Sequence, residues 1–178
     1  VLPLVDFFCP SIEELCWMLD RDRLVSWEAR ANSGDVTAVL ETDRDIRPLA
    51  DECMALGCKV LLLKCGAAGM YLKTAGKETL EKIAPAVALD AGLWADQDFF
   101  EESYVPRQVL SGTGAGDTSI AAFLKAVTDG YDPRMTMHLA AATGASCVEA
   151  YDARSGLRSF EELKAKIASG WKKNHLKY

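Results

Sequence analysis

Apolar positions along this chain follow two different periods, and each period predicts a different kind of element. In "SIEELCWMLDRDRL", apolar residues fall three and four positions apart, which predicts a helix that begins at Ser11. Ser11 and Glu14 also match the spacing of a capping box. Short apolar runs bounded by turn residues predict buried strands instead, and the opening "VLPLVDFF" predicts one that ends at Pro10.

The remaining elements follow from the same two patterns. Residues 26–42 lose periodicity and contain "NSGD", which indicates a loop with at most a short helix, while 75–103 cannot be assigned. Further strands are expected at 60–63, at 70–73 as a hairpin-like strand after a glycine-rich turn, and at 104–110. Further helices are expected at 43–56, 114–129, 133–150 and 159–168.

This order of elements predicts the fold class. Strands separated by helices, followed by a helical final third, indicate an α/β fold with a largely parallel sheet flanked by helices. The 178 residues, of which 49% are apolar, suffice for one core of ordinary domain size. We therefore expect a single three-layer α/β unit.

Composition narrows the classes of partner. A net charge of −6 argues against a nucleic-acid binder, which would usually carry a basic face. No apolar run approaches the roughly 20 residues that span a bilayer. The six cysteines form no C-x-x-C pair and have two histidines, His138 and His175, as companions, so neither a zinc site nor a disulfide framework is expected. These features predict a soluble cytoplasmic protein with no membrane or nucleic-acid partner.

The stretch "SGTGAGDTS", residues 111–119, places three glycines at the entrance of a predicted helix. The dinucleotide pattern G-x-G-x-x-G would require glycine where Asp117 stands, and the P-loop pattern would require a lysine that the stretch lacks. What remains is a short glycine turn before a helix, whose free N–H groups and positive dipole end favour an anion. The stretch predicts a phosphate cradle.

Asp117 admits two interpretations at this point. Aspartate commonly caps a helix and stabilises it by about 1 kcal/mol. A carboxylate at the edge of a phosphate cradle can instead take a proton from the nucleophile that attacks the phosphate. The residue types alone do not decide between them.

The stretch "TGAGDTSIAAFLKAV" resembles the C-terminal signature of the ribokinase-like (PfkB) carbohydrate kinases. The resemblance implies that the N–H groups of Gly114, Ala115 and Gly116 form an anion hole and that Asp117 is the catalytic base. It also places Thr113 beside the nucleotide.

Other segments follow the order of the same family. "FFCPSIEEL" resembles its Pro-Asn-x-x-Glu stretch, which implies that Glu14 organises the magnesium and phosphate water shell. "VLLLKCGAAGMYL" resembles the strand and glycine turn that border the nucleotide, which implies nucleotide contacts for Lys64, Gly66 and Gly69. "HLAAATGASCV" resembles the helix over the adenine, and Ala141 lies there.

The resemblance implies an ATP-dependent kinase that phosphorylates a sugar or sugar-like hydroxyl with ATP and Mg²⁺, of which residues 1–178 form the C-terminal nucleotide-binding and catalytic portion. It leaves open a monovalent cation and a homodimer of the full-length protein. Ser11, Ser111 and Ala141 depart from the family pattern and motivate an alternative, a catalytically silent nucleotide-binding module.

Overall fold

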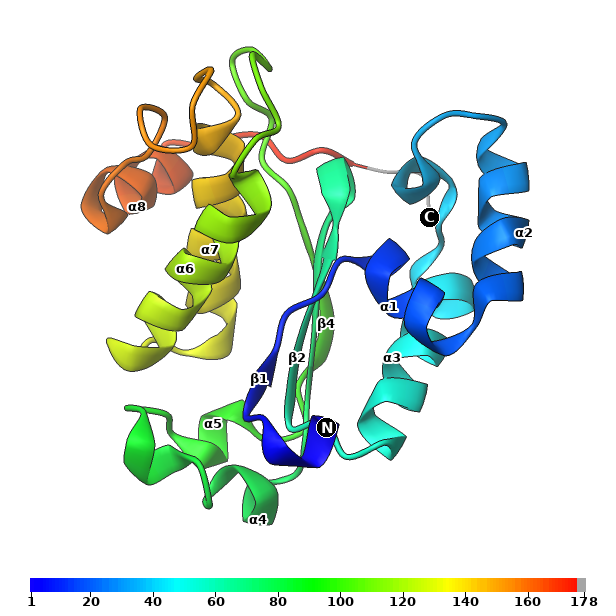
Figure 1. Ribbon diagram of the computed structural model, residues 1–178. Coiled ribbons are helices and arrows are strands. Elements are labelled where there is room, and N and C mark those ends of the chain that lie inside the picture. The colour runs from blue at the N-terminus through cyan, green and yellow to red at the C-terminus, as the bar shows by residue number, and fades with distance from the viewer. Residues whose placement is uncertain (176–178) are drawn as a thin grey trace.

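The computed structural model describes residues 1–175, in which helices cover both faces of a four-stranded sheet (Figure 1). The strands are β1 (Phe7–Phe8), β2 (Val60–Cys65), β3 (Gly69–Thr74) and β4 (Asp98–Glu102). The α-helices are α1 (Ile12–Leu19), α2 (Arg21–Ala31), α3 (Arg47–Ala55), α4 (Lys77–Leu80), α5 (Ala91–Trp94), α6 (Ala115–Thr128), α7 (Pro133–Cys147) and α8 (Phe160–Ala168). Short 3₁₀ or π turns are η1 (Leu2–Leu4), η2 (Val36–Val39), η3 (Thr42–Ile46), η4 (Gly66–Ala68) and η5 (Ala84–Ala86).

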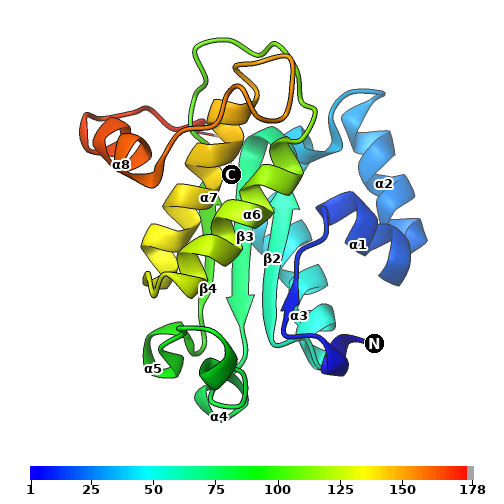
Figure 2. The ribbon, with the colours of Figure 1, turned by 60° about the vertical axis from the view of Figure 1, so that its left-hand side comes forward.

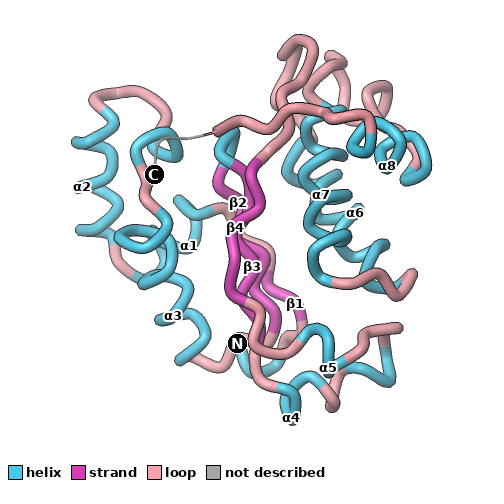
Figure 3. Tube along the Cα trace, turned by 180° about the vertical axis from the view of Figure 1, so that it is seen from behind, coloured by secondary structure: helices cyan, strands magenta, loops and turns pink. Residues whose placement is uncertain are grey.

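The sheet separates two hydrophobic clusters, because successive side chains of a strand point to opposite faces. Val60 and Leu62 of β2 pack with α6 and α7, whereas Leu61 and Leu63 pack with α1, α2 and α3. Figure 2 shows α6 and α7 across one face, and Figure 3 shows the two helical layers on either side of the sheet. The α/β class and the three-layer arrangement predicted from the sequence are confirmed.

The prediction of a largely parallel sheet is wrong. The strand order is β1-β2-β3-β4, and β1 pairs with β2 in parallel, but β2 with β3 and β3 with β4 are antiparallel. The reason is local: the turn at Gly66–Ala68 is too short for the crossover that a parallel pair needs, so it returns the chain as a hairpin. The described sheet is mixed.

Helix α1 begins as predicted, with Ser11 and Glu14 in a complete capping box. The helices expected at 43–56, 114–129, 133–150 and 159–168 and the strands of the hairpin are also confirmed.

Three local predictions are wrong. The chain opens as the 3₁₀ turn η1 with exposed Val1 and Leu4, and only β1 joins the sheet. Segment 104–110 is a loop that makes one isolated bridge, between Tyr104 and Lys173. Helix α2 extends into the predicted loop, because it buries Trp27 and leaves most of its surface polar, so its apolar stripe is too sparse to detect.

A buried ion pair fixes the segment that packs against the glycine turn at Gly66–Ala68. The Asp45 carboxylate, 4% exposed, accepts hydrogen bonds from both terminal nitrogens of Arg30 at 2.6 and 2.8 Å, from Trp27 Nε1 and from the Glu41 N–H. Burial, the largest single influence, would raise the pKa of Asp45, but the hydrogen bonds from Arg30 and the Glu41 N–H and the charge of Arg30 together hold the pKa below its usual value. Between the partners lies η2, whose Thr37 packs against the glycine turn.

Substituting Asp45→Asn should lower the free energy of unfolding by about 3 kcal/mol at pH 7, because Arg30 loses its buried counter-charge. Because the folded pKa lies below the unfolded one, the stability from Asp45 is present above pH ~4 and is lost as pH falls through the folded pKa. Urea unfolding at pH 7 and pH 3 measures both effects. Asp43→Asn, at an exposed position paired with Arg47, is the control, and equal losses in the two variants would contradict the assignment.

Candidate active site

Helix α6 begins at a glycine that no other residue could replace without strain. Gly114 is the N-cap, with φ of 79° in the left-handed region. A methyl group at this position would lie 2.2 Å from the Cβ atom of Ala153, which belongs to the loop after α7. Both the backbone conformation and the contact with the loop therefore require glycine at this position.

The first N–H groups of α6 are available to a ligand. The Ala115 N–H donates to the Gly112 carbonyl at 3.2 Å, whereas the N–H groups of Gly114, Gly116 and Asp117 have no acceptor among residues 1–175. Two of the three N–H groups expected to form the anion hole are thus free, and that of Asp117 joins them. Unpartnered N–H groups and the positive end of the helix dipole favour an anion here.

Lys64 adds a full positive charge at the same place. Strand β2 carries Lys64 to the start of α6, and the Lys64 N–H donates to the Pro10 carbonyl at 3.0 Å. A methyl group on Gly116 would lie 3.5 Å from Lys64 Nζ. Within the described chain this ammonium forms no hydrogen bond and no ion pair. We call the Lys64 ammonium and the free N–H groups of Gly114, Gly116 and Asp117 the anion cradle.

The Asp117 carboxylate lies beside the anion cradle without a partner of its own. Asp117 is the third residue of α6, exposed, and its side chain forms no hydrogen bond with any residue from 1 to 175. The N-cap position belongs to Gly114 and has no side-chain cap. Of the two interpretations of Asp117, helix capping therefore has no support in the geometry, and a role towards a ligand remains.

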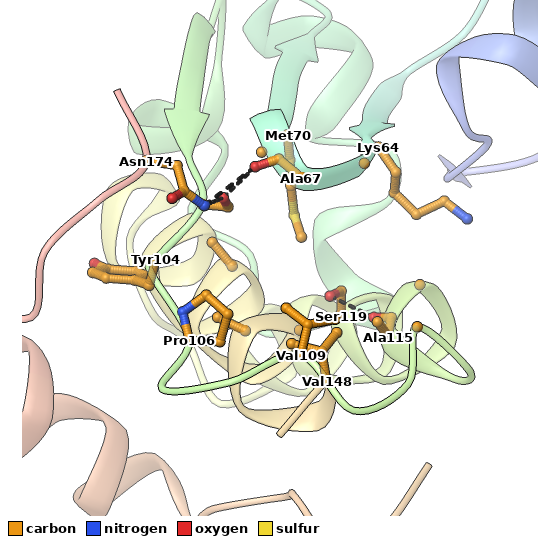
Figure 4. Close-up of a pocket in the computed structure, with 18 residues that line it drawn as sticks. Lys64, Ala67, Met70, Tyr104, Pro106, Val109, Ala115, Ser119, Val148 and Asn174 are labelled. Carbon is orange, nitrogen blue, oxygen red and sulfur yellow. Dashed lines mark hydrogen bonds between the residues drawn. The ribbon is translucent and has the colours of Figure 1, made fainter. Parts of the chain in front are cut away.

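A cavity of about 560 Å³ extends from the anion cradle (Figure 4). Its volume lies in the range of roughly 300–1,000 Å³ that is usual for small-molecule sites. Small and apolar residues form most of its wall. The lining residues are Lys64, Gly66, Ala67, Gly69, Met70, Ser103, Tyr104, Pro106, Val109, Gly112, Ala115, Gly116, Ser119, Ala141, Gly144, Ala145, Val148 and Asn174.

Small residues keep this cavity open and its helices close. A methyl group on Gly144 of α7 would lie 2.5 Å from Ser119 Oγ of α6, so the two helices approach closely at this point. Gly69, with φ of 136°, lies so near β4 that a methyl group would lie 2.1 Å from the Glu101 carbonyl oxygen. Any larger side chain would push α6 from α7, or the glycine turn from β4.

Residues 1–159 match the family model described as pfkB family carbohydrate kinase. The chain belongs to this family.

Individual relatives agree with the family. A protein from Archaeoglobus fulgidus, described as an uncharacterized sugar kinase, is 28% identical over 113 residues, which cover 64% of this chain and 37% of that protein. A structure of Arabidopsis thaliana ribokinase complexed with ribose and ATP matches with a TM-score of 0.63 at 23% identity, over 92% of this chain and 41% of that one. A putative ribokinase II in complex with ATP and Mg²⁺ from E. coli matches with a TM-score of 0.55 at 18% identity, over 88% and 46%. The chain thus spans about two fifths of the length of these proteins.

The fold of this pfkB-family chain brings most of the predicted site residues together. Six of them line the cavity: Lys64, Gly66, Gly69, Ala115, Gly116 and Ala141. Gly114, Thr113 and Asp117 flank the same helix start. Thr113 donates its N–H to Ser111 Oγ at 3.1 Å, which orders the turn before α6.

Glu14 lies outside the cavity, in a neighbouring hollow formed by β1 and α1. One carboxylate oxygen, Oε2, accepts the Ser11 N–H at 2.6 Å, and this backbone hydrogen bond, with the nearby Lys64 charge, lowers the pKa of Glu14. The carboxylate is exposed and its second oxygen accepts no hydrogen bond from residues 1–175. Both interpretations of Glu14, as a cap and as an acid that faces a hydrated cation, are compatible with this geometry.

Several wall residues were not predicted from the sequence. Ser103, Tyr104, Pro106 and Val109 belong to a segment interpreted as a strand or left unassigned, and Asn174 follows the last helix. Nothing in their local sequence pattern indicates a site, because contacts between distant segments place them. His138 of α7 lies outside this wall and pairs with β4, with Nδ1 at 2.7 Å from Glu101 Oε1.

Substitution by alanine should affect stability very differently at the two glycines that flank Thr113. Gly114→Ala combines a left-handed φ with a clash against Ala153 and should lower the free energy of unfolding by at least ~2 kcal/mol. Gly112→Ala is the control, since a methyl group there has no neighbour within 4 Å. Chemical denaturation of the two variants measures the difference, and a Gly114→Ala protein as stable as Gly112→Ala would refute the geometry given for the start of α6.

Proposed function

We propose that this chain is the nucleotide-binding and catalytic portion of an ATP-dependent sugar kinase, which transfers the γ-phosphoryl group of ATP to a sugar hydroxyl. One observation carries the proposal. Asp117, an exposed carboxylate with no hydrogen-bond partner in residues 1–175, lies on the same helix turn as the free N–H groups, and its neighbour Gly116 faces the Lys64 ammonium. Phosphoryl transfer needs this combination, a proton acceptor beside a site that holds negative charge.

The cavity and the anion cradle suit the two halves of a nucleoside triphosphate. Apolar and small side chains such as Ala141, Val109 and Val148 can contact the flat faces of a base. The cradle can hold the phosphates, because Gly116 leaves room for a phosphate to approach the backbone and Lys64 supplies a charge that no described residue pairs with. The Arabidopsis and E. coli structures are complexes with ATP, which supports the same assignment.

In the proposed reaction, Asp117 accepts the proton of the sugar hydroxyl as that oxygen forms its bond to the γ-phosphorus. The bond between the γ-phosphorus and the bridging oxygen breaks, and its electron pair stays on the departing ADP. The N–H groups of Gly114 and Gly116 and the Lys64 ammonium stabilise the charge on the transferred group. A single preorganised donor of this kind contributes about 3 kcal/mol to lowering the barrier.

Mg²⁺ is the metal that the proposal requires, and Glu14 could supply part of its binding site. Mg²⁺ usually keeps several waters and binds one or two carboxylates together with substrate phosphates, so a cluster of protein ligands is not needed. Glu14 offers one carboxylate oxygen free of hydrogen bonds from the described residues. When bound, the metal would neutralise phosphate charge, and Glu14 would hold its water shell.

A sugar is the proposed acceptor because the family consists of carbohydrate kinases and because the Arabidopsis relative is described with ribose. The alternative of a silent nucleotide-binding module predicts binding without turnover. The free Asp117 carboxylate favours the kinase, because mere binding of an anion would be weakened by a negative charge at this position.

Substituting Asp117→Asn in the intact protein should reduce kcat at least ~100-fold, since a positioned general base contributes 10²–10⁴-fold. The Kd of ATP should stay the same or fall, because the substitution removes a charge that repels phosphate. Turnover is measured as sugar-dependent ADP release and Kd by calorimetry.

Asp129→Asn is the matched control for this substitution. Asp129 is an acid at the other end of α6, where it pairs with Lys125. Loss of turnover in both variants, or in neither, would argue against Asp117 as the base. A wild-type protein that binds ATP but turns over no sugar would support the silent module.

A further inference from the structure

The segment after the last helix, Trp171–His175, runs along the wall of the cavity, and we call it the C-terminal strap. Figures 1 and 3 show the chain leaving α8 and crossing the end of the sheet. The Val105 N–H donates to the Lys172 carbonyl and the Asn174 N–H to the Ser103 carbonyl, both at 2.8 Å. The strap is thus paired with the chain that follows β4, as a strand would be.

Side chains hold the strap at both ends of this pairing. The Trp171 ring lies 4.7 Å from that of Tyr104, and Trp171 Nε1 donates to the Val105 carbonyl at 2.7 Å. Lys173 Nζ lies 2.5 Å from Glu101 Oε1, a carboxylate that is 3% exposed. A cation stabilises a buried carboxylate, so this ion pair ties the strap to β4.

These contacts bring the Asn174 side chain to the cavity and fix how its amide is turned. The Ser103 hydroxyl donates its hydrogen to the Ala67 carbonyl, so Ser103 Oγ can only accept from Asn174. Asn174 Nδ2 lies 2.8 Å from Ser103 Oγ and 3.5 Å from the Ala67 carbonyl oxygen. The amide nitrogen therefore faces these two acceptors, which leaves Oδ1 as an acceptor without a donor in residues 1–175.

Asn174 lies at the end of the cavity away from the anion cradle. Figure 4 shows Asn174 and Tyr104 on one side and Lys64 and Ala115 on the other. If phosphates occupy the cradle, the base of the nucleotide lies towards Asn174.

Few other polar side chains line the cavity, and each already forms a hydrogen bond within the chain or, like Lys64, lies at the other end of the cavity. Ser119 Oγ donates to the Ala115 carbonyl at 2.7 Å, and the Tyr104 hydroxyl lies 3.3 Å from His138 Nδ1, with burial raising the pKa of that phenol. Ala141, on the helix that covers this end, has no polar group to offer.

We propose that Asn174 reads the base of the bound nucleotide, with its Oδ1 accepting a hydrogen bond from the 6-amino group of adenine. This inference rests on the proposed function, since it takes the ligand to be ATP. A 6-oxo base would bring two acceptors face to face at Oδ1, and a base with hydrogen at position 6 would leave Oδ1 without a donor. The strap thereby makes the cavity selective for adenine.

The test compares ATP with purine riboside triphosphate, which differs from ATP by the absence of the 6-amino group. Calorimetry on the intact protein should show a Kd for ATP about tenfold lower than for the analogue, the effect of one neutral hydrogen bond. Asn174→Ala should bring the ratio of the two Kd values close to one, because it raises the Kd of ATP and leaves that of the analogue unchanged. Inosine triphosphate, with a 6-oxo group, should bind the wild type more weakly still.

Two further variants separate recognition of the base from mere support of the strap. Asn174→Asp keeps an acceptor for the 6-amino group, and Ser103 can turn its hydroxyl to the new carboxylate, so this variant should retain the preference for ATP. Lys172→Ala removes an exposed side chain from the same strap and should retain it too.

If Asn174 has only a structural role, Asn174→Ala will weaken the binding of both nucleotides equally and leave the ratio of their Kd values unchanged. That result overturns the inference. Equal affinity of the wild type for both nucleotides overturns it as well, while the proposed kinase function stands. A wild type that binds no nucleotide overturns the proposed function and this inference together.

Discussion

The Lys64 ammonium lies against the positive end of the α6 dipole, and no carboxylate of the described residues forms an ion pair with it. Lys64 reaches the first turn of α6, where the N–H groups of Gly114, Gly116 and Asp117 have no acceptor in residues 1–175. Such a juxtaposition is unfavourable unless a ligand or water occupies it, because the helix dipole and the ammonium repel each other. The rest of the fold holds this arrangement in place. The roles proposed for Asn174, at the far end of the cavity, and for Asp117, beside the anion cradle, both depend on it.

Close packing is what maintains the arrangement. Gly144 lets α7 approach α6 at Ser119, and Gly114 accepts the loop at Ala153. On the other side, β2 fixes Lys64 through the hydrogen bond to Pro10, so that the lysine and Glu14 come from adjoining segments. A helix start, a strand end and the beginning of α1 converge at one edge of the sheet, which is where α/β proteins commonly bind their ligands.

The sequence predicts those parts of the site that are written in local patterns. The Gly-Ala-Gly-Asp turn, the capping box at Ser11 and the strand that carries Lys64 each lie within a few residues, and each was found where expected. The place of β4 beside β3 and the loop at 104–110 depend on pairing between distant segments, so periodicity could not reveal them. Asn174 is the extreme case, since it meets Ser103 across 71 residues.

The central claim is that the start of α6 and Lys64 together bind the phosphates of a nucleotide. Titrating the ¹⁵N-glycine-labelled intact protein with ATP and observing its amide resonances tests this claim most directly. The account predicts that the amides of Gly114 and Gly116 shift most, while that of Gly130, at the far end of α6, stays in place. Saturable ATP binding that leaves Gly114 and Gly116 unshifted would contradict it.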